Sequence, residues 1–346
     1  MRIGIDLMGG ENSPHDFFVA VEKAAVELGA AHTLLVIATK KVVEDLKPRV
    51  PKKIKDQSKI EFHVVRETIK MGDEPLGAVR RKKRSSIVVG ISLLKRRRIN
   101  AFVSSGNTGA LVASATLSLS KLPGIKRPAL LAMLPTETGS LAVIDVGGNV
   151  SCKAHHLVQF AQLGCAYQRS ILGKKVPVVG LLNIGVESIK GTAEVQQAYE
   201  ILNKMNGKQF QFLGNIEGRH VFQGDIDVLV TDGFTGNVLL KTTEGASDFI
   251  FGAIEETLKG HPSSQLKKTL KELRTHFNYA EYPGAIVCGV DGVVVKCHGN
   301  STAKALLSGI LGAYELVEKG TVDLLREGLI NNALDFRDLK NLMLND

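Results

Sequence analysis

Short apolar segments alternate with longer amphipathic segments along nearly the whole chain. Most of the short segments are almost continuous runs of Val, Ile and Leu, which is typical of parallel strands buried on both faces. This alternation predicts an α/β protein with a doubly wound sheet between two helical layers, a three-layer α/β/α sandwich. The expected strands are residues 2–6, 33–38, 60–65, 101–105, 129–134, 141–146, 176–182, 210–213, 226–231, 285–290 and 293–297.

No long linker or low-complexity segment divides the chain, so we expect residues 1–346 to form a single catalytic unit. Residues 247–282 depart from the alternation, because two helix-like stretches follow each other there without a strand between them. We expect this segment to form a helical hairpin that projects from the sheet. The expected helices are residues 16–28, 76–95, 108–119, 154–171, 193–205, 238–258 and 303–318.

The positive charge of the chain is concentrated in one segment. Lys and Arg total 44 and Asp and Glu total 35, a net charge of +9. Residues 80–98 contain nine of these bases and no acid, so they account for the whole surplus. With no Trp and 5% aromatic residues, the chain lacks the stacking side chains of a typical single-strand nucleic-acid binder.

Several other classes of protein are disfavoured. No apolar run approaches the ~18 residues needed to cross a bilayer, and the first residues do not resemble a signal peptide. The four cysteines form no CxxC pair, which favours a reduced, cytoplasmic protein with buried thiols. HExxH and EF-hand spacings are absent, so the sequence predicts no metal site.

Gly-Asn pairs recur where apolar runs end. In an open parallel sheet these ends line the crevice where ligands bind, and the helix N-termini nearby favour an anion. The alternative is that Gly-Asn simply forms turns. The five pairs begin at Gly106, Gly148, Gly214, Gly236 and Gly299.

The segment Ser104–Gly109 is the strongest of these candidates for anion binding. It ends an expected strand and starts an expected helix, so small hydroxyl side chains and backbone N–H groups could surround a phosphate. It matches neither the GxGxxG nor the P-loop pattern, and nucleotide binding is therefore not supported. The predicted phosphate-binding residues are Ser105, Gly106, Asn107 and Thr108.

Four further residues at strand ends could take part in catalysis. Lys190 could hold an anion or be a solvated loop lysine. Asp232 could position a ligand or cap the following helix, and Asn237 follows it. His298 could be a base or a structural histidine. No GxSxG nucleophile elbow is present, so the expected chemistry is ligand positioning and electrostatic stabilisation.

Several motifs in collinear order resemble those of the bacterial phosphate acyltransferases of phospholipid synthesis. The resemblance runs from Met1 to about Gly320. It includes Asp6-Leu7-Met8-Gly9-Gly10 with Pro14, residues 104–110, residues 144–150 with Lys153 and His156, residues 180–185, residues 214–219, residues 232–237 with Lys241, and Tyr282 with His298-Gly299.

The resemblance implies a reaction and its partners. Such enzymes reversibly convert an acyl-carrier-protein thioester and inorganic phosphate into acyl phosphate and free carrier protein, without a cofactor. They are homodimers with a fold like that of isocitrate and isopropylmalate dehydrogenases. The resemblance also implies a cytoplasmic protein that touches the inner membrane surface and passes acyl phosphate to a membrane acyltransferase. The chain departs from the family pattern at Glu11, at Thr192-Ala193 and at Asn300.

The implied partners suggest roles for two further groups of residues. Acyl carrier proteins are acidic, so Arg80, Arg81, Lys82 and Arg84 are candidate docking residues. A solvated helix face is the alternative for the bases at 95–98. In the expected hairpin, Leu266, Leu270 and Leu273 lie at helical spacing beside a basic face, and are candidate membrane contacts or dimer contacts.

Two other functions remain as alternatives. One is an NAD-dependent dehydrogenase on the related fold, and the other is a non-enzymatic protein that binds a polyanion through residues 80–98.

Overall fold

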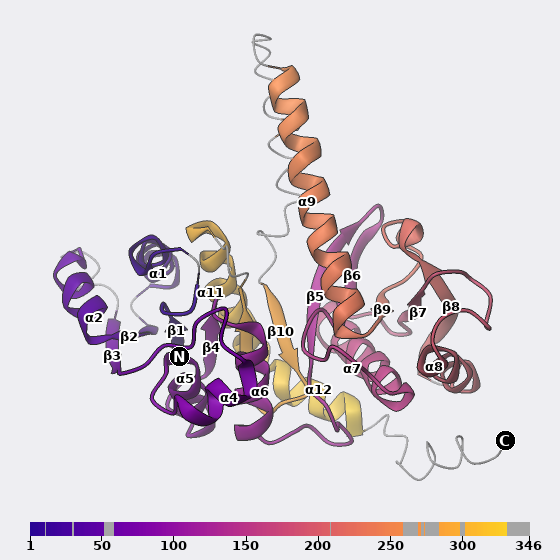
Figure 1. Ribbon diagram of the computed structural model, residues 1–346, viewed down its shortest axis with the longest axis horizontal. Helices are drawn as coiled ribbons and strands as arrows, with labels where there is room; N and C mark the ends of the chain where they lie inside the picture. Colours follow the sequence, from indigo (N-terminus) through magenta and orange to yellow (C-terminus); the bar gives the residue numbers. More distant parts are fainter. Residues whose placement is uncertain are drawn as a thin grey trace.

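Within the described residues, eleven strands form one mixed sheet in the order β3-β2-β1-β4-β11-β10-β5-β6-β9-β7-β8 (Figure 1). The coordinates are those of a computed structural model, which describes residues 1–10, 12–29, 31–51, 59–207, 209–258, 269–270, 273, 284–297 and 302–330. The strands are β1 (Arg2–Asp6), β2 (Thr33–Thr39), β3 (Lys59–Val65), β4 (Ala101–Ser104), β5 (Ala129–Thr136), β6 (Gly139–Ile144), β7 (Val178–Asn183), β8 (Gln211–Glu217), β9 (Val228–Val230), β10 (Ala285–Cys288) and β11 (Val293–Lys296).

Helices cover both faces of this sheet. Phe17 and Phe160 belong to the core on one face, whereas Ile87 and Leu111 belong to the core on the other. The mixed α/β fold expected from the alternation is therefore confirmed. The helices are α1 (Pro14–Leu28), α2 (Lys40–Leu46), α4 (Pro75–Arg81), α5 (Ser86–Lys95), α6 (Thr108–Ser118), α7 (Ala154–Leu172), α8 (Ala193–Lys204), α9 (Gly233–Thr257), α11 (Ala303–Glu318) and α12 (Thr321–Ile330), with short 3-10 turns at Lys47–Arg49 and Gly218–His220.

The sheet differs from the expected parallel sheet at its centre. β3, β2, β1, β4 and β11 form one parallel block, and β6, β9, β7 and β8 form another. Between them β10 is antiparallel to both β11 and β5, and β5 is antiparallel to β6. Two residues join β5 to β6, and four residues join β10 to β11. These connections are too short for a parallel crossover, so they form hairpins and reverse the strand direction.

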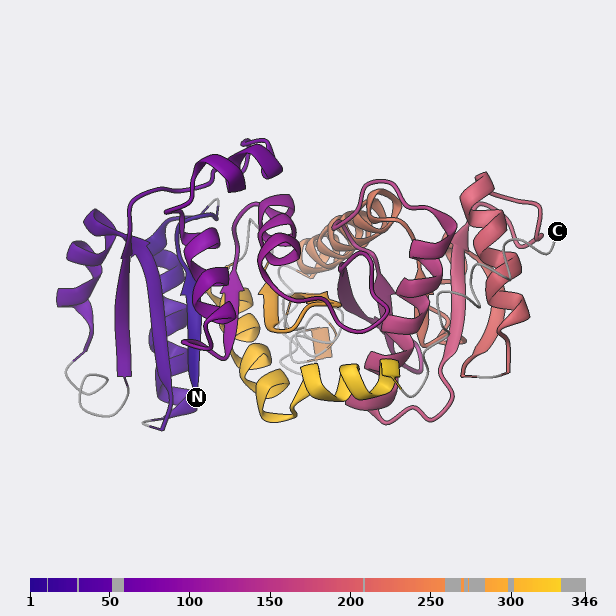
Figure 2. The same ribbon diagram turned by 90° about the horizontal axis from the view of Figure 1, so that it is seen from below.

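Two consecutive helices connect the halves of the molecule. α11 packs on α1 and on β11, and α12 packs on α7. Seen from below, this pair runs along the middle of the elongated molecule, between the half with β2 and the half with β8 (Figure 2). The helical layer therefore continues across the reversal of strand direction.

The expected helix at residues 76–95 is two helices, α4 and α5. They are separated because the intervening loop pairs with another part of the chain: the amides of Arg66 and Glu67 donate to the carbonyl of Arg84. Ser85 then starts α5 as its N-cap. A sequence pattern at helical spacing cannot show this interruption, because it depends on a distant strand end.

α9 is the most prominent departure from a compact outline. It begins at Gly233, five residues before the expected start, and its C-terminal half projects from the body (Figure 1). Most of the expected hairpin at 247–282 lies outside the described residues, including Leu266. Among the helices of the described residues, none is both long and apolar enough to cross a membrane.

Candidate functional site

Three polar side chains form a row across the ends of neighbouring parallel strands. Asp6 of β1 lies opposite Ser104 of β4, and Ser104 lies opposite Lys296 of β11. All three side chains are buried, and the Ser104 hydroxyl donates to the Asp6 carboxylate over 2.8 Å. Together with the loops that follow these strands, they form what we call the first edge: Asp6–Gly10, Ser104–Thr108 and Lys296–Cys297.

Two glycine-bearing loops of the first edge meet backbone to backbone. A Cβ on Gly9 would lie 2.4 Å from the Cα of Gly106. A side chain at Gly9 would therefore force the two loops apart. This contact brings the two motifs, which are almost 100 residues apart in the chain, to one place in the fold. It also places the Ser105 hydroxyl beside Gly10, where a Cβ would lie 2.8 Å from the Ser105 Oγ.

The Ser105 hydroxyl is fully buried, and its Oγ has no hydrogen-bond partner among the residues that the structure describes. A buried hydroxyl without a partner is costly, and such groups often mark the place of a missing ligand or water. It lies just before α6, whose first N–H groups have no partner within the helix. The predicted phosphate-binding turn therefore has unused donors, from Ser105 and from the start of α6.

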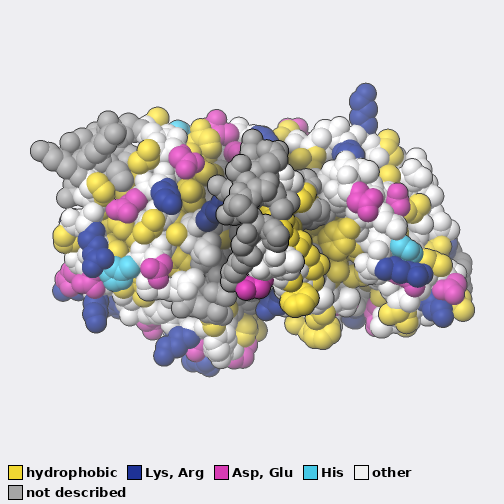
Figure 3. Space-filling model, turned by 90° about the horizontal axis from the view of Figure 1, so that it is seen from above, with side chains coloured by type: hydrophobic (Ala, Val, Ile, Leu, Met, Phe, Trp, Pro, Cys, Tyr) yellow, Lys and Arg dark blue, Asp and Glu magenta, His cyan; other side chains and the backbone are white. Residues whose placement is uncertain are grey.

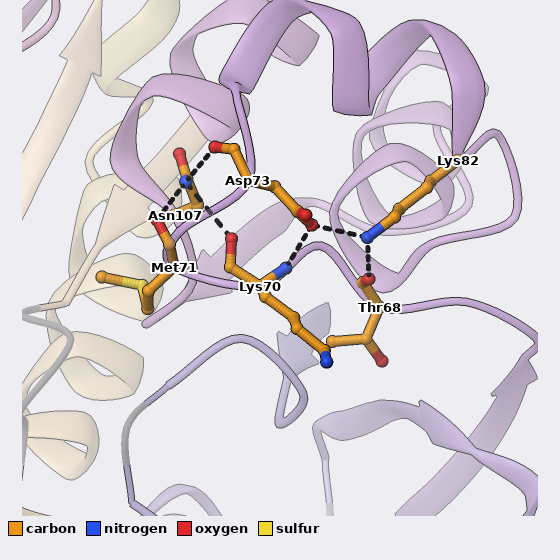
Figure 4. Close-up of polar contacts among 6 residues, drawn as sticks. All are labelled: Thr68, Lys70, Met71, Asp73, Lys82 and Asn107. Atoms are coloured by element: carbon orange, nitrogen blue, oxygen red, sulfur yellow. Dashed lines mark hydrogen bonds and ion pairs between the residues drawn. The ribbon is translucent and has the colours of Figure 1, made fainter.

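Asn107, one of the predicted phosphate-binding residues, uses its side chain within the protein. Its Oδ1 accepts from the amide of Ala110 and caps α6. Its Nδ2 donates to the carbonyls of Lys70, Met71 and Asp73 at 3.4, 2.9 and 3.2 Å (Figure 4). Both ends of the amide are thus engaged by the protein. The Gly106 amide is also engaged, because it donates to the Ser104 hydroxyl.

Lys296 is a functional candidate that the sequence reasoning missed. Its Nζ donates to the carbonyl of Ser105 at 3.3 Å and to the carbonyl of Cys297. Burial raises the pKa of Asp6, and the charge of Lys296 is among the influences that lower it again. A lysine at the end of the run Val293-Val294-Val295 was the available signal, since a charge seldom ends a fully buried strand without a partner.

The second edge follows β6, β9 and β7, which are parallel with Ile144 opposite Val230 and Val230 opposite Leu181. Asp145 organises its first loop. The buried Asp145 carboxylate accepts hydrogen bonds from the amides of Leu130, Gly147 and Gly148 and from the side chain of Asn149. Burial raises the pKa of Asp145, and these hydrogen bonds oppose the rise.

Asp232 is the N-cap of α9. Its carboxylate accepts from the amide and the hydroxyl of Thr235 at 2.8 and 2.9 Å, which is the capping alternative considered for this residue. Asn237 lies one turn further on and is half-buried. It faces the loop at Gly147, where a Cβ would lie 3.7 Å from the Asn237 side chain. Asn237 therefore borders the same loop that Asp145 holds.

Lys190 is exposed in the loop that follows β7. The backbone of this loop is well held, because Asn183 donates to the Lys190 carbonyl and Asn215 donates to the Glu187 carbonyl. Thr192, one of the departures from the family pattern, is the N-cap of α8 and accepts from the amide of Val195. The loop thus keeps a defined end despite that departure.

α9 joins the two edges. Asn237, Lys241 and Glu244 are spaced four and three residues apart, so they share one face of the helix. Burial raises the pKa of Glu244 to about 7, and the charges of Lys241 and Lys296 act in the opposite direction. Glu244 of α9 is therefore close enough to Lys296 of the first edge to sense its charge. Asn237 is about 10 Å back along the helix, at the second edge.

The remaining predicted residues are the candidate docking bases, His298, and the candidate membrane contacts. Arg80, Arg81 and Arg84 are exposed, whereas Lys82 is half-buried and pairs with Asp73 at 2.5 Å. His298 lies outside the described residues, as do Glu11 and Asn300. The Leu273 residue is 43% exposed, and Leu270 is half-buried. Within the described ranges, no group of three or more His, Cys, Asp or Glu side chains is arranged to hold a metal ion.

Comparison with known proteins identifies the family. The family described as "Fatty acid synthesis protein" matches residues 1–324. Phosphate acyltransferases from Caldicellulosiruptor saccharolyticus and Halothermothrix orenii are 41% and 39% identical to this chain, and each alignment covers 94% of the chain and 98% of the relative. The chain belongs to the phosphate acyltransferase family. It is therefore an acyltransferase, as its motifs predicted. This family membership disfavours the alternatives of a dehydrogenase and of a non-enzymatic polyanion-binding protein.

Solved structures show where the phosphate acyltransferase fold recurs. A phosphotransacetylase from Streptococcus pyogenes matches with a TM-score of 0.59 and 16% identity, covering 92% of this chain and 94% of that one. A branched-chain phosphotransacylase from Enterococcus faecalis matches with a TM-score of 0.54 and 16% identity, covering 92% and 99%. At this identity the likeness establishes a shared fold.

Proposed function

We propose that this phosphate acyltransferase reversibly transfers a fatty acyl group from an acyl-carrier-protein thioester to inorganic phosphate, giving acyl phosphate for phospholipid synthesis. Family membership supports acyl transfer to phosphate, and the resemblance of the chain's motifs supports the carrier protein as donor. The observation that carries the phosphate site is the buried Ser105 hydroxyl at the N-terminus of α6, for which the described part of the chain offers no hydrogen-bond partner.

The phosphate would be held by the first edge. The Ser105 hydroxyl and the first N–H groups of α6, around Thr108, supply hydrogen-bond donors. Lys296 supplies a positive charge beside the Ser105 carbonyl. Asn107 and Gly106 contribute by shaping the turn, since their polar groups already bond to the protein.

In the proposed reaction, a phosphate oxygen attacks the thioester carbonyl carbon. The new C–O bond forms, the C–S bond breaks, and the electron pair leaves with the sulfur of the carrier. Phosphate is already an anion, so the main requirement is its placement close to the carbonyl. The tetrahedral oxyanion needs fixed donors, and we assign these to Lys190 and Asn237 of the second edge. The leaving thiolate needs little help, because thiols have a pKa of about 8.5.

Asp232 and His298 are secondary candidates for this chemistry. The capping role of Asp232 supports an indirect contribution, in which it holds the start of α9 and thereby the position of Asn237. His298 directly follows Lys296 and Cys297 of the first edge in the sequence. In this proposal His298 is a hydrogen-bond donor near the phosphate.

The carrier protein would dock on the basic segment. Arg80 and Arg81 are exposed at the end of α4, and Arg84 is exposed just beyond it. An acidic carrier would be attracted there by long-range electrostatics. Lys82 belongs to the same segment, but its ammonium group is already paired with Asp73.

We propose that the protein is a homodimer and that it works in the cytoplasm, against the inner membrane surface, beside a downstream membrane acyltransferase. Large apolar side chains support an interface around the second edge and along α9. Seen from above, hydrophobic side chains gather beside the projecting α9 (Figure 3). The exposed ones are Val150, Ile184, Val186, Ile189, Phe234, Val238, Phe249 and Ile250.

We also propose that residues 1–346 form one catalytic unit, from which a helical hairpin at 247–282 projects. The proposed fold is the doubly wound, three-layer type of isocitrate and isopropylmalate dehydrogenases. The helices on both faces of one continuous sheet support it.

The experiment that tests the function is incubation of the purified chain with palmitoyl-carrier protein and inorganic phosphate. We expect free carrier protein and acyl phosphate to form in equal amounts, and to form only when phosphate is present. Carrier release without acyl phosphate, or no reaction with the carrier thioester, would contradict the proposal. Palmitoyl-coenzyme A in place of the carrier thioester tests whether the donor must be a protein.

A further inference from the structure

The loop before α4 is fastened by an ion pair. Lys82 donates to the Asp73 carboxylate at 2.5 Å and to the Thr68 carbonyl at 3.0 Å (Figure 4). Asp73 also accepts from the amide of Lys70 at 2.8 Å. The ion-pair side chains are 30% and 28% exposed, so both are largely shielded from water. The hydrogen bond from Lys82 lowers the pKa of Asp73, which favours the charged carboxylate that this ion pair needs.

The fastened loop presents its carbonyls to Asn107. The Lys70, Met71 and Asp73 carbonyls all accept from the Asn107 Nδ2, whose other end caps α6 (Figure 4). The loop and α6 are also in close contact two residues further on, because a Cβ on Gly109 would lie 2.6 Å from the Pro75 ring. The loop thus fixes the direction of the Asn107 amide and with it the start of α6.

We propose that Asp73 and Lys82 are positioning residues for the phosphate-binding turn at Ser105–Thr108. The inference rests on the proposed function of that turn. Neither side chain touches the turn directly, so both act through the loop carbonyls and Asn107. Lys82 therefore differs from its neighbours in the basic segment: it serves phosphate binding, whereas Arg80 and Arg81 serve docking.

Lys82→Met and Asp73→Asn test the proposal, with Lys83→Met as the matched control. Lys83 is an exposed neighbour, so its replacement removes the same charge from the same segment without breaking the ion pair. We expect Lys82→Met and Asp73→Asn to raise the KM for phosphate by about tenfold, because shifts of ~1 Å in positioning groups cost up to about a hundredfold. The KM for the acyl donor should stay as in Lys83→Met.

The double variant separates a shared role from two independent ones. If the two residues act as one pair, Asp73→Asn in the Lys82→Met background raises the phosphate KM no further. Additive effects would overturn the proposal, and so would an unchanged phosphate KM or a rise confined to the acyl donor. Urea unfolding of each variant shows whether it is folded under the assay conditions.

Phosphate binding without turnover distinguishes this inference from the proposed function. The rise in the midpoint of thermal unfolding with added phosphate measures binding directly. We expect this rise to need higher phosphate concentrations in Lys82→Met and Asp73→Asn than in Lys83→Met. Such a result supports the positioning role even if the carrier thioester proves to be the wrong donor. Equal phosphate responses in all variants would overturn it.

Discussion

The hydroxyl of Ser104 donates a 2.8 Å hydrogen bond to the carboxylate of Asp6, across the β1–β4 pair and inside the protein. The same Oγ accepts from the amide of Gly106, so one hydroxyl connects a buried acid to the turn proposed to bind phosphate. The Asp6 carboxylate also accepts from the amide of Met8. Two loops that are far apart in the sequence are thereby held at one point of the first edge.

Ser104→Ala should lower the free energy of unfolding by about 1–3 kcal/mol, because the buried Asp6 carboxylate loses a donor. Ser114→Ala is the matched control. Ser114 is equally buried, but its hydroxyl has no hydrogen-bond partner within the described ranges, so its removal should be nearly neutral. Urea unfolding of both variants measures the difference. Equal losses in the two would show that the Ser104–Asp6 bond contributes nothing specific.

Lys190→Ala should reduce acyl-phosphate formation on the order of 10²-fold without unfolding the protein, if Lys190 stabilises the oxyanion. The exposed side chain leaves the core unchanged. Lys175→Ala removes an exposed lysine before the same strand, β7, and should keep full activity. The measurement is turnover at saturating phosphate and acyl donor. Unchanged turnover in Lys190→Ala would remove this residue from the mechanism.

Reversing the charges of Arg80 and Arg81 to Glu should raise the KM for the acyl carrier protein by about tenfold at low salt, with less effect above ~0.15 M salt. Lys40→Glu with Lys41→Glu makes the same change in net charge on α2. Initial rates over a range of carrier concentrations measure the effect. If both double variants behave alike, the basic segment attracts the carrier only through overall charge.

Leu270→Glu should weaken binding to vesicles that contain anionic lipid, because a charge would enter the apolar face proposed to contact the membrane. Leu117→Glu, at an exposed leucine on α6 in the body of the protein, is the control. Flotation with vesicles measures the bound fraction. Equal flotation of both variants and the unaltered chain would favour the dimer-contact alternative for this face.

The raised pKa of Glu244 predicts that the stability of the protein depends on pH. Burial raises its pKa to about 7, above the ordinary value of 4.5. Between these two values the unfolded chain releases a proton that the folded chain retains, so the contribution of Glu244 to stability falls as pH rises from 4.5 to 7. Glu244→Gln lacks this titration and should gain in relative stability over that range. Urea unfolding at pH 5 and pH 7.5 tests this.

A parallel displacement of the two stability curves, with no change in their separation between pH 5 and 7.5, would show that Glu244 keeps an ordinary pKa. Lys241, Asp248 and Lys296 are the charged groups that act on it. Lys241→Met should raise the pKa of Glu244 further, because it removes a nearby positive charge.

Local sequence was enough to predict most of the helices and strands. Runs of Val, Ile and Leu marked the strands, and Asn107 and Thr192 cap helices within a few residues of the expected starts. The family could also be predicted, because its motifs are short stretches of consecutive residues. These features depend on backbone propensity and on neighbours a few positions away, which a single sequence displays directly.

Only the tertiary structure decided how those elements combine. The β5–β6 and β10–β11 hairpins divide the sheet into two opposed blocks. Lys296 reaches Ser105 across 191 positions of the chain, and Asn107 reaches a loop more than 30 positions away. Such contacts arise from the packing of distant segments, where most buried polar groups form hydrogen bonds. The sequence alone therefore determined which residues could bind phosphate, and the fold determined which of them have donors to spare.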